Sequence, residues 1–261
     1  MRAVPVAALG LALACFANAC RSPAPEARTP LAVFAASSLT EAFADLEQGF
    51  EATHPEVDVQ LTFAGSQVLR LQIEQGAAAD VFASANEQHM RALVDAGLVG
   101  ETHAFAANAL VVIVPLGPGH IERFEQLAEA QRVVVGTENV PVGRYAGAML
   151  DKARAAYGDA FAAAVRAHIV SEESNVRLLR AKVELGEADA AVVYGTDASP
   201  RVRVVAIPAA LNVRATYPIA AVSKSPHATE AAQFIEYVRS PAGQGLLRRH
   251  GFLPADAGIM P

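Results

Sequence analysis

The sequence has little of what several classes of protein require. Its only two cysteines, Cys15 and Cys20, lie within the first 20 of 261 residues, and at most one of them would survive cleavage of a leader, so no internal disulfide is expected. Acidic and basic residues are interspersed, with a net charge of −6, which excludes a nucleic-acid surface and a polybasic membrane patch. The seven histidines are scattered without metal-ligand spacing, so we expect neither a metal-cation site nor a cofactor.

The N-terminal segment has the features of a targeting sequence and not of a structural element. Arg2 supplies a positive charge, and residues 4–16 form an apolar run that is too short to span a bilayer. Residues 17–19, Ala-Asn-Ala, match the A-x-A pattern of a cleavage site. We therefore expect a secretory signal peptide over residues 1–19 and a mature protein outside the cytoplasm.

Cys20 follows this cleavage site directly, as the lipidated cysteine does in the lipobox of bacterial lipoproteins. The pattern predicts a lipid anchor at Cys20, in the periplasm or on the outer cell surface, as the only attachment to a membrane. Asn18 is unusual in a lipobox and Cys15 offers a competing site, so plain secretion is the alternative. Residues 20–30 are rich in proline and are expected to form a tether.

From residue 31 onward, apolar segments typical of buried strands alternate with amphipathic helix patterns. Apolar residues make up 52% of the chain, enough for a substantial core in one large domain or two lobes. The alternation favours an α/β fold with a mostly parallel sheet. Strands are expected at residues 31–36, 57–63, 80–83, 110–114, 132–135, 190–193, 203–207 and 217–222, and helices at residues 38–51, 67–75, 87–96, 124–130, about 144–168, 175–185 and 229–239, with a short one after 241.

The first expected strand runs directly into a helix through Ser37 and Ser38. Ser38 and Glu41 have the spacing of a capping box, in which Ser38 is the N-cap and Glu41 reaches back from the third helical position. Such a junction directs free backbone N–H groups and a hydroxyl past the strand end, which suits an anion. An ordinary helix cap with nothing bound is the simpler interpretation of this motif alone.

Similar junctions recur along the chain. Ser66 separates the second strand from the second helix, and the turn-rich loop at residues 136–143 exposes the backbone around Val142. If Ser174 is an N-cap, Val176 occupies the second helical position, where its N–H has no intrahelical partner. Ligands of doubly wound sheets bind beyond the carboxyl ends of the strands, so these junctions are predicted to meet at one site.

Converging helix N-termini and hydroxyls would form a cage of neutral donors suited to a small tetrahedral oxyanion. No arginine or lysine lies within the two serine junctions, so the attraction would come from oriented dipoles. A secreted hydrolase that uses Ser37 or Ser38 as its nucleophile is an alternative from a different class. No G-x-S-x-G elbow surrounds these serines, and no histidine or aspartate partner can be assigned to them.

Seven short motifs follow one another between residues 31 and 252: VFAASSLTEAF, FAGSQ, QIEQGAAADVFASA, NVPVGRYA, AVVYGTDA, YPIAAV and RRHGF. Together they resemble the periplasmic molybdate-binding proteins of ABC transporters, which belong to the type II periplasmic-binding-protein superfamily. The resemblance implies a two-lobed α/β fold in which each lobe is a mostly parallel sheet flanked by helices and two crossover strands form the hinge. The first lobe would comprise residues 31–107 and 217–261, and the second residues 108–216.

The resemblance also implies a monomeric binding protein, and not an enzyme, that captures molybdate or tungstate for an ABC permease in the membrane. Gln67 stands where many members have a further hydroxyl residue, and Asn175 where an acidic residue is common. These departures leave the preference among molybdate, tungstate and sulfate open, and a binding protein for sulfate or another tetrahedral oxyanion is the alternative. The implied ligand groups are the hydroxyls and amides of two serines, two backbone amides and one tyrosine hydroxyl: Ser38, Ser66, Val142, Val176 and Tyr194.

Overall fold

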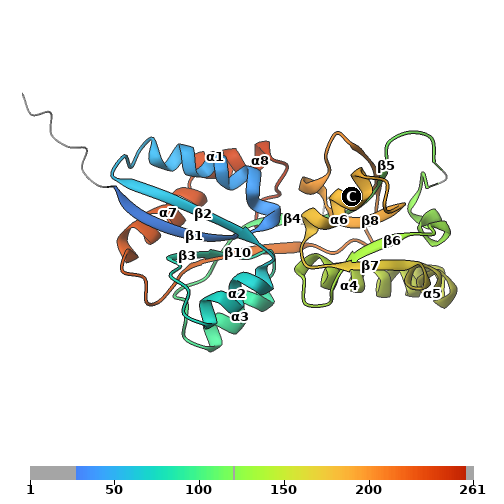
Figure 1. Ribbon diagram of the computed structural model, residues 1–261, viewed down its shortest axis with the longest axis horizontal. Helices are drawn as coiled ribbons and strands as arrows, with labels where there is room; N and C mark the ends of the chain where they lie inside the picture. The colour runs from blue at the N-terminus through green and yellow to red at the C-terminus, as the bar shows by residue number, and fades with distance from the viewer. Residues whose placement is uncertain (1–27, 120, 257–261) are drawn as a thin grey trace, which may run out of the picture.

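The computed structural model describes residues 28–119 and 121–256. The predicted signal peptide, the lipidation site at Cys20 and all but the end of the predicted tether lie outside the described residues. Within residues 28–119 and 121–256, none of the helices combines the length and the apolar sequence that crossing a bilayer demands. Figure 1 shows two lobes side by side along the long axis of the molecule, each built on its own sheet.

The two sheets share one strand arrangement. The first lobe has the order β2-β1-β3-β10-β4, and β10 runs antiparallel to its neighbours while the other strands are parallel. The second lobe has the order β7-β6-β8-β5-β9, and here β5 is the antiparallel strand. The bounds are β1 Thr29–Ala36, β2 Val57–Ala64, β3 Val81–Ala83, β4 His103–Asn108, β5 Leu110–Pro115, β6 Val133–Gly136, β7 Ile169–Glu173, β8 Ala190–Tyr194, β9 Val202–Ala206 and β10 Ala215–Ala221.

The chain crosses between the lobes twice. Strand β4 ends at Asn108 in the first lobe, and β5 begins at Leu110 in the second lobe. The chain returns between β9, at the edge of the second sheet, and β10, in the interior of the first (Figure 1). The predicted fold class, two mostly parallel α/β lobes joined by two crossovers, is therefore confirmed.

Side chains that alternate along β1 give the first sheet a helix layer on each face. Val33 and Ala35 share a buried cluster with Phe43 of α1, whereas Phe34 belongs to a second cluster with Leu69 of α2. Figure 1 shows α1, α7 and α8 on one side of this sheet and α2 and α3 on the other. The helix bounds are α1 Thr40–Glu51, α2 Ser66–Glu74, α3 Glu87–Asp95, α4 Pro141–Tyr157, α5 Asp159–Ala167, α6 Val176–Glu184, α7 Ala228–Arg239 and α8 Pro241–Arg249, with 3₁₀ turns at Ser37–Leu39, Phe124–Glu129 and Gly195–Asp197.

Two edge strands were missed by the sequence patterns, and one strand is longer than expected. Strand β4, with the sequence HAFAAN, is rich in alanine, which has little β-propensity, and β7 ends in a polar Ser-Glu-Glu run. Strand β1 begins at Thr29, so the last residues of the predicted tether belong to the sheet. Pro30 is tolerated there because β1 is paired only with β2 until Val33, where the pairing with β3 starts.

Candidate functional site

A small cavity lies between the two lobes, where segments that are far apart in the sequence meet. It offers about 10 Å³ to the centre of a water molecule, close to what one water requires, so it suits only a small ligand. All five residues predicted to bind the ligand line this cavity, and their role as ligands stays a prediction. The lining comprises Ala36, Ser37, Ser38, Gly65, Ser66, Ala85, Val140, Pro141, Val142, Asn175, Val176 and Tyr194.

Ser38 lies in the 3₁₀ turn Ser37–Leu39, which follows β1 directly. The predicted capping box is wrong: α1 begins at Thr40, with Leu39 as its N-cap and no hydrogen bond from a capping side chain. The physical reason is that the tight turn takes up both serines before the helix starts. The Ser38 hydroxyl instead lies 3.1 Å from the hydroxyl of Tyr217, a buried residue of β10.

Ser66 is the first residue of α2, and only 1% of it is exposed. Its Oγ accepts a hydrogen bond from the backbone N–H of Ala85 at 3.0 Å. Because the hydroxyl oxygen already has this donor, the hydroxyl proton remains available to a ligand. The preceding Gly65 lets the lobes approach here, since a Cβ atom at this position would lie 2.5 Å from the carbonyl oxygen of Ser174.

Val142 lies in the first turn of α4 and not in the loop that the sequence predicted. The helix begins earlier than expected because Pro141 occupies its first position, where proline is favoured and its missing N–H costs nothing. The N–H of the second helical residue has no intrahelical acceptor. The positive end of the α4 dipole therefore lies at the cavity, with the Val142 amide as a free donor.

Val176 is the first residue of α6, and the prediction that Ser174 caps this helix is wrong. Asn175 is the N-cap, and its Oδ1 accepts the N–H groups of Arg177 at 3.0 Å and Leu178 at 3.2 Å. An asparagine side chain is as good a cap as a serine, and this choice moves Val176 from the second helical position to the first. Its N–H likewise lacks an intrahelical acceptor.

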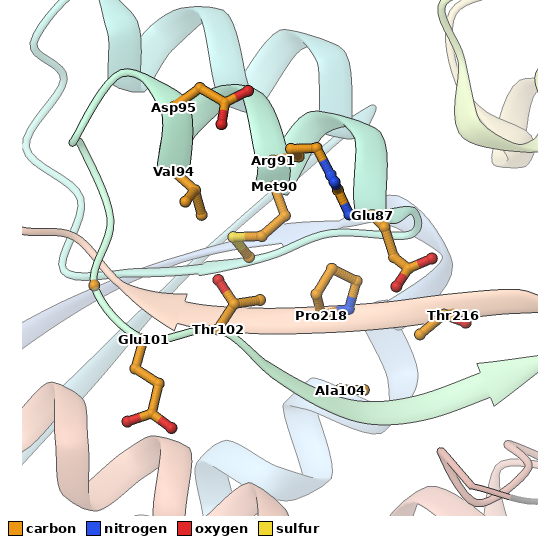
Figure 2. A pocket seen from close by; sticks show the side chains of 11 residues that line it. Glu87, Met90, Arg91, Val94, Asp95, Glu101, Thr102, Ala104, Thr216 and Pro218 are labelled. Atoms are coloured by element: carbon orange, nitrogen blue, oxygen red, sulfur yellow. The ribbon is translucent and has the colours of Figure 1, made fainter.

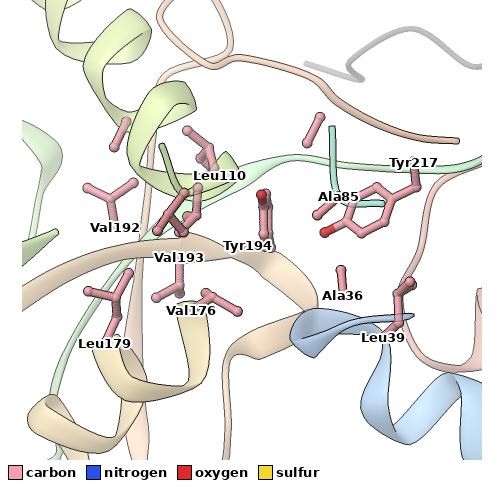
Figure 3. Packing of buried hydrophobic residues seen from close by; sticks show 14 of the residues in the cluster. Ala36, Leu39, Ala85, Leu110, Val176, Leu179, Val192, Val193, Tyr194 and Tyr217 are labelled. Carbon is pink, nitrogen blue, oxygen red and sulfur yellow. The ribbon is translucent and has the colours of Figure 1, made fainter. Parts of the chain in front are cut away.

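Tyr194 ends β8 and lies deep between the lobes, with 1% of the residue exposed. Its ring makes edge-on contacts with Tyr145 and Tyr217, and Figure 3 shows it beside Val176 with the Tyr217 ring reaching toward it. Burial raises the pKa of the Tyr194 hydroxyl well above its usual value, so the group stays protonated. In the described part of the chain this hydroxyl has no hydrogen-bond partner, which is unusual for a buried donor.

A larger hollow on the first lobe lies away from the interlobe cavity, between α3 and the strands β4 and β10 (Figure 2). It measures about 590 Å³ and shares no lining residue with that cavity. Its walls carry the carboxylates of Glu87, Asp95 and Glu101 and the cation of Arg91. This net negative charge opposes an anion, so the hollow does not meet the requirements of the predicted site.

Comparison with known proteins agrees with this architecture. Residues 31–253 match a family model described as "Bacterial extracellular solute-binding protein". The chain belongs to this family. The description of this family is that of a solute-binding protein and not of an enzyme.

Individual relatives extend over most of this solute-binding protein. The "Molybdate-binding protein ModA" of Mycobacterium tuberculosis is 36% identical over 228 residues, which cover 85% of this chain and 84% of the relative. The "Putative ABC transporter substrate-binding lipoprotein YvgL" of Bacillus subtilis is 32% identical over 234 residues, which cover 87% of each chain. The solved periplasmic molybdate-binding protein of Azotobacter vinelandii superposes with a TM-score of 0.75 at 19% identity, over 85% of this chain and 98% of that chain, and this similarity supports the fold alone.

The two lobes of this solute-binding protein are bridged around the cavity by contacts that the sequence did not reveal. Arg177 forms an ion pair with Glu41 across the lobes. Glu41 is thus committed to Arg177 and not to the helix cap. Three side chains also donate to backbone carbonyl oxygens of the opposite lobe: Gln67 to Ser174 at 2.7 Å, His89 to Asn139 at 2.8 Å and Arg177 to Ser37 at 3.1 Å.

One buried carboxyl group lies close to this site without lining the cavity. Asp197 is 3% exposed, and its Oδ2 has no hydrogen-bond partner among the described residues. Burial raises the pKa of Asp197 to about 7, although the nearby charges of Arg177 and Arg180 act in the opposite direction. No lysine or arginine is among the residues that line the cavity, so the groups that face a ligand are neutral donors.

Proposed function

We propose that this protein captures molybdate or tungstate outside the cytoplasm and presents it to an ABC importer. The observation that carries the proposal is the convergence of neutral donors in one small cavity. The hydroxyls of Ser38, Ser66 and Tyr194 and the first-turn amides of Val142 and Val176 surround it. The printed name of the M. tuberculosis relative, a molybdate-binding protein, supports the same ligand.

The donor set suits a fully deprotonated tetrahedral dianion. Each of these groups can donate a proton, and none is a carboxylate that could accept one. Molybdate and tungstate are almost wholly deprotonated near neutral pH, so every ligand oxygen can accept a hydrogen bond. Phosphate keeps at least one P–O–H group there, and leaving such a buried polar group unpaired costs about 1–3 kcal/mol. The site therefore disfavours phosphate by its chemistry.

Sulfate is the alternative ligand, because it is also a full dianion and only its smaller size distinguishes it from molybdate. We expect it to bind weakly, since fixed donors placed for a larger anion cannot all contact a smaller one. A serine hydrolase is disfavoured by the contacts of Ser38, whose hydroxyl lies against a tyrosine and not against a histidine.

In the cell, we propose that a lipid on Cys20 holds the protein at the outer face of the membrane or in the periplasm, where it works as a monomer. The name of the B. subtilis relative, a lipoprotein, is consistent with this placement. Fatty-acid labelling of the full chain tests it. Cys20→Ser should abolish the label without altering anion binding, whereas a label that persists would assign the lipid to Cys15.

Anion titration is the direct test of the ligand. Calorimetry on the wild-type protein near pH 7 should give strong binding of molybdate and tungstate, weak binding of sulfate and no detectable binding of phosphate. The Ser38→Ala/Ser66→Ala double variant is the matched control and should lose most of the molybdate affinity while remaining folded. Equal molybdate affinity in the double variant would remove the site assignment, and effective competition by phosphate would contradict the donor-only chemistry.

A further inference from the structure

We infer that Tyr217 is a positioning residue that fixes the Ser38 hydroxyl as a donor to the bound oxyanion. This inference rests on the proposed function, because it assigns a role at the same site. Tyr217 opens the motif YPIAAV, but no role at the site was predicted for it, and it lies 179 positions from Ser38 along the chain.

The Tyr217 ring is held rigidly. It lies on β10, is fully buried, and packs edge-on against Phe105, Tyr194 and Phe252, with ring centroids 6.3, 5.7 and 5.4 Å away. Contacts on several sides leave the ring no room to rotate away. Its hydroxyl therefore has a fixed place, 3.1 Å from the Ser38 Oγ.

Either hydroxyl of this pair could be the donor, but an anion in the cavity decides the direction. If Ser38 gave its proton to Tyr217, the Ser38 oxygen would face the anion with lone pairs, which is repulsive. If Tyr217 donates to Ser38, the Ser38 oxygen has a donor and the Ser38 proton is free for the anion. Tyr217 is therefore the donor of the pair when an anion is bound.

The resulting chain of donors runs from Tyr217 through Ser38 to the anion, and hydrogen bonds in such a chain strengthen one another. Ser66 shows the same design with a different donor, since its oxygen accepts the Ala85 N–H. The oxygen of each serine thus accepts a hydrogen bond from a protein donor, which leaves the hydroxyl proton of each serine for the ligand. The donor to Ser38 is the Tyr217 side chain, which a substitution can remove, whereas the donor to Ser66 is a backbone N–H.

A double-mutant cycle tests the inference. Tyr217→Phe keeps the ring and its packing and removes only the hydroxyl, so molybdate affinity measured by calorimetry should fall about five- to tenfold, as expected for one lost hydrogen bond. Tyr217→Phe should lower the molybdate affinity by the same factor in a Ser66→Ala background, because the Ser66 oxygen accepts from the Ala85 N–H and does not depend on Tyr217. In a Ser38→Ala background, Tyr217→Phe should leave the molybdate affinity unchanged, because the Ser38 proton that Tyr217 orients is already absent.

Tyr237→Phe is the matched control, because it removes a tyrosine hydroxyl from α7, away from the cavity, and should leave affinity unchanged. An equal loss from Tyr217→Phe in the wild-type and Ser38→Ala backgrounds would overturn the inference and leave Tyr217 a packing residue. An unchanged affinity in Tyr217→Phe would also overturn it. These outcomes differ from failure of the proposed function, which would appear as absence of molybdate and tungstate binding in the wild-type protein and would remove both proposals.

Discussion

Asp197 should make the stability of this protein depend on pH in a direction opposite to that of most aspartates. Its carboxyl group is buried, with Arg177, Arg180 and Glu41 as the nearby charges. Burial raises its pKa from 3.8 to about 7. The folded protein therefore binds the Asp197 proton more tightly than the unfolded chain does.

The sign of the effect follows from this difference. The contribution of Asp197 to stability is fully present below the unfolded pKa of 3.8 and is lost as the pH rises through the folded value of about 7. A shift of about three pKa units, at ~1.4 kcal/mol each, corresponds to roughly 4 kcal/mol. Since about two of those units lie between pH 5 and pH 7, we expect a loss of about 2–3 kcal/mol between pH 5 and pH 8.

Urea unfolding of the wild-type protein and of Asp197→Asn at pH 5 and pH 8 measures this contribution. The two proteins share every other titrating group, so the difference between their free energies of unfolding isolates Asp197. The asparagine variant should gain about 2–3 kcal/mol relative to the wild type when the pH is raised. A difference that is the same at both pH values would refute the reasoning and show that the Asp197 carboxyl does not hold its proton at neutral pH.

Three further substitutions have defined outcomes. Ser66→Ala should weaken molybdate binding about 10- to 100-fold in a calorimetric titration, because a hydrogen bond to a charged group contributes roughly 1.5–3 kcal/mol; a loss below threefold would argue against a direct contact. Gly143→Ala should lower the free energy of unfolding by about 1–3 kcal/mol in urea, because its Cβ would lie 2.2 Å from the Gly136 carbonyl oxygen, and an unchanged value would contradict that packing. Arg177→Met removes the ion pair with Glu41 that joins the lobes and should weaken anion binding about two- to fivefold, with little change in the free energy of unfolding, since exposed ion pairs contribute ~1 kcal/mol or less. Unaltered affinity would show that this ion pair does not contribute to anion binding.

Local patterns were sufficient to predict most elements and four of the residues that line the cavity, whereas Tyr194 was predicted from the family resemblance. The strand-to-helix junctions are short-range features, and hydrophobic periodicity places them within a few residues. Ser66 and Val142 were found in this way, although α4 begins at Pro141, earlier than the glycine-containing loop suggested. The cap of α6 was misplaced by one residue because Ser174 and Asn175 are equally good N-caps.

The rest of the site depends on contacts that no local pattern encodes. Tyr217 meets Ser38 only because β10 returns to the first lobe after the whole second lobe has been formed. Likewise, the sequence pattern places Arg177 on a helix, but it does not show that the Arg177 side chain reaches Glu41 in the other lobe. Such long-range contacts also explain why β4 was missed, since its alanines become a strand only when β10 lies beside them.

The position of β10 has a consequence for the order in which the protein can fold. Strand β10 lies between β3 and β4 in the finished sheet, yet it is synthesised only after all of the second lobe. The second sheet is made from one continuous stretch, β5 to β9, and can be completed by itself. The first sheet instead needs β10 to insert between β3 and β4 after the second lobe has been made. Such pairing between segments far apart in the chain is intrinsically slow. We therefore expect the lobe that carries both serines to become native last, so that a nascent chain completes its second lobe before the cavity between the lobes can form.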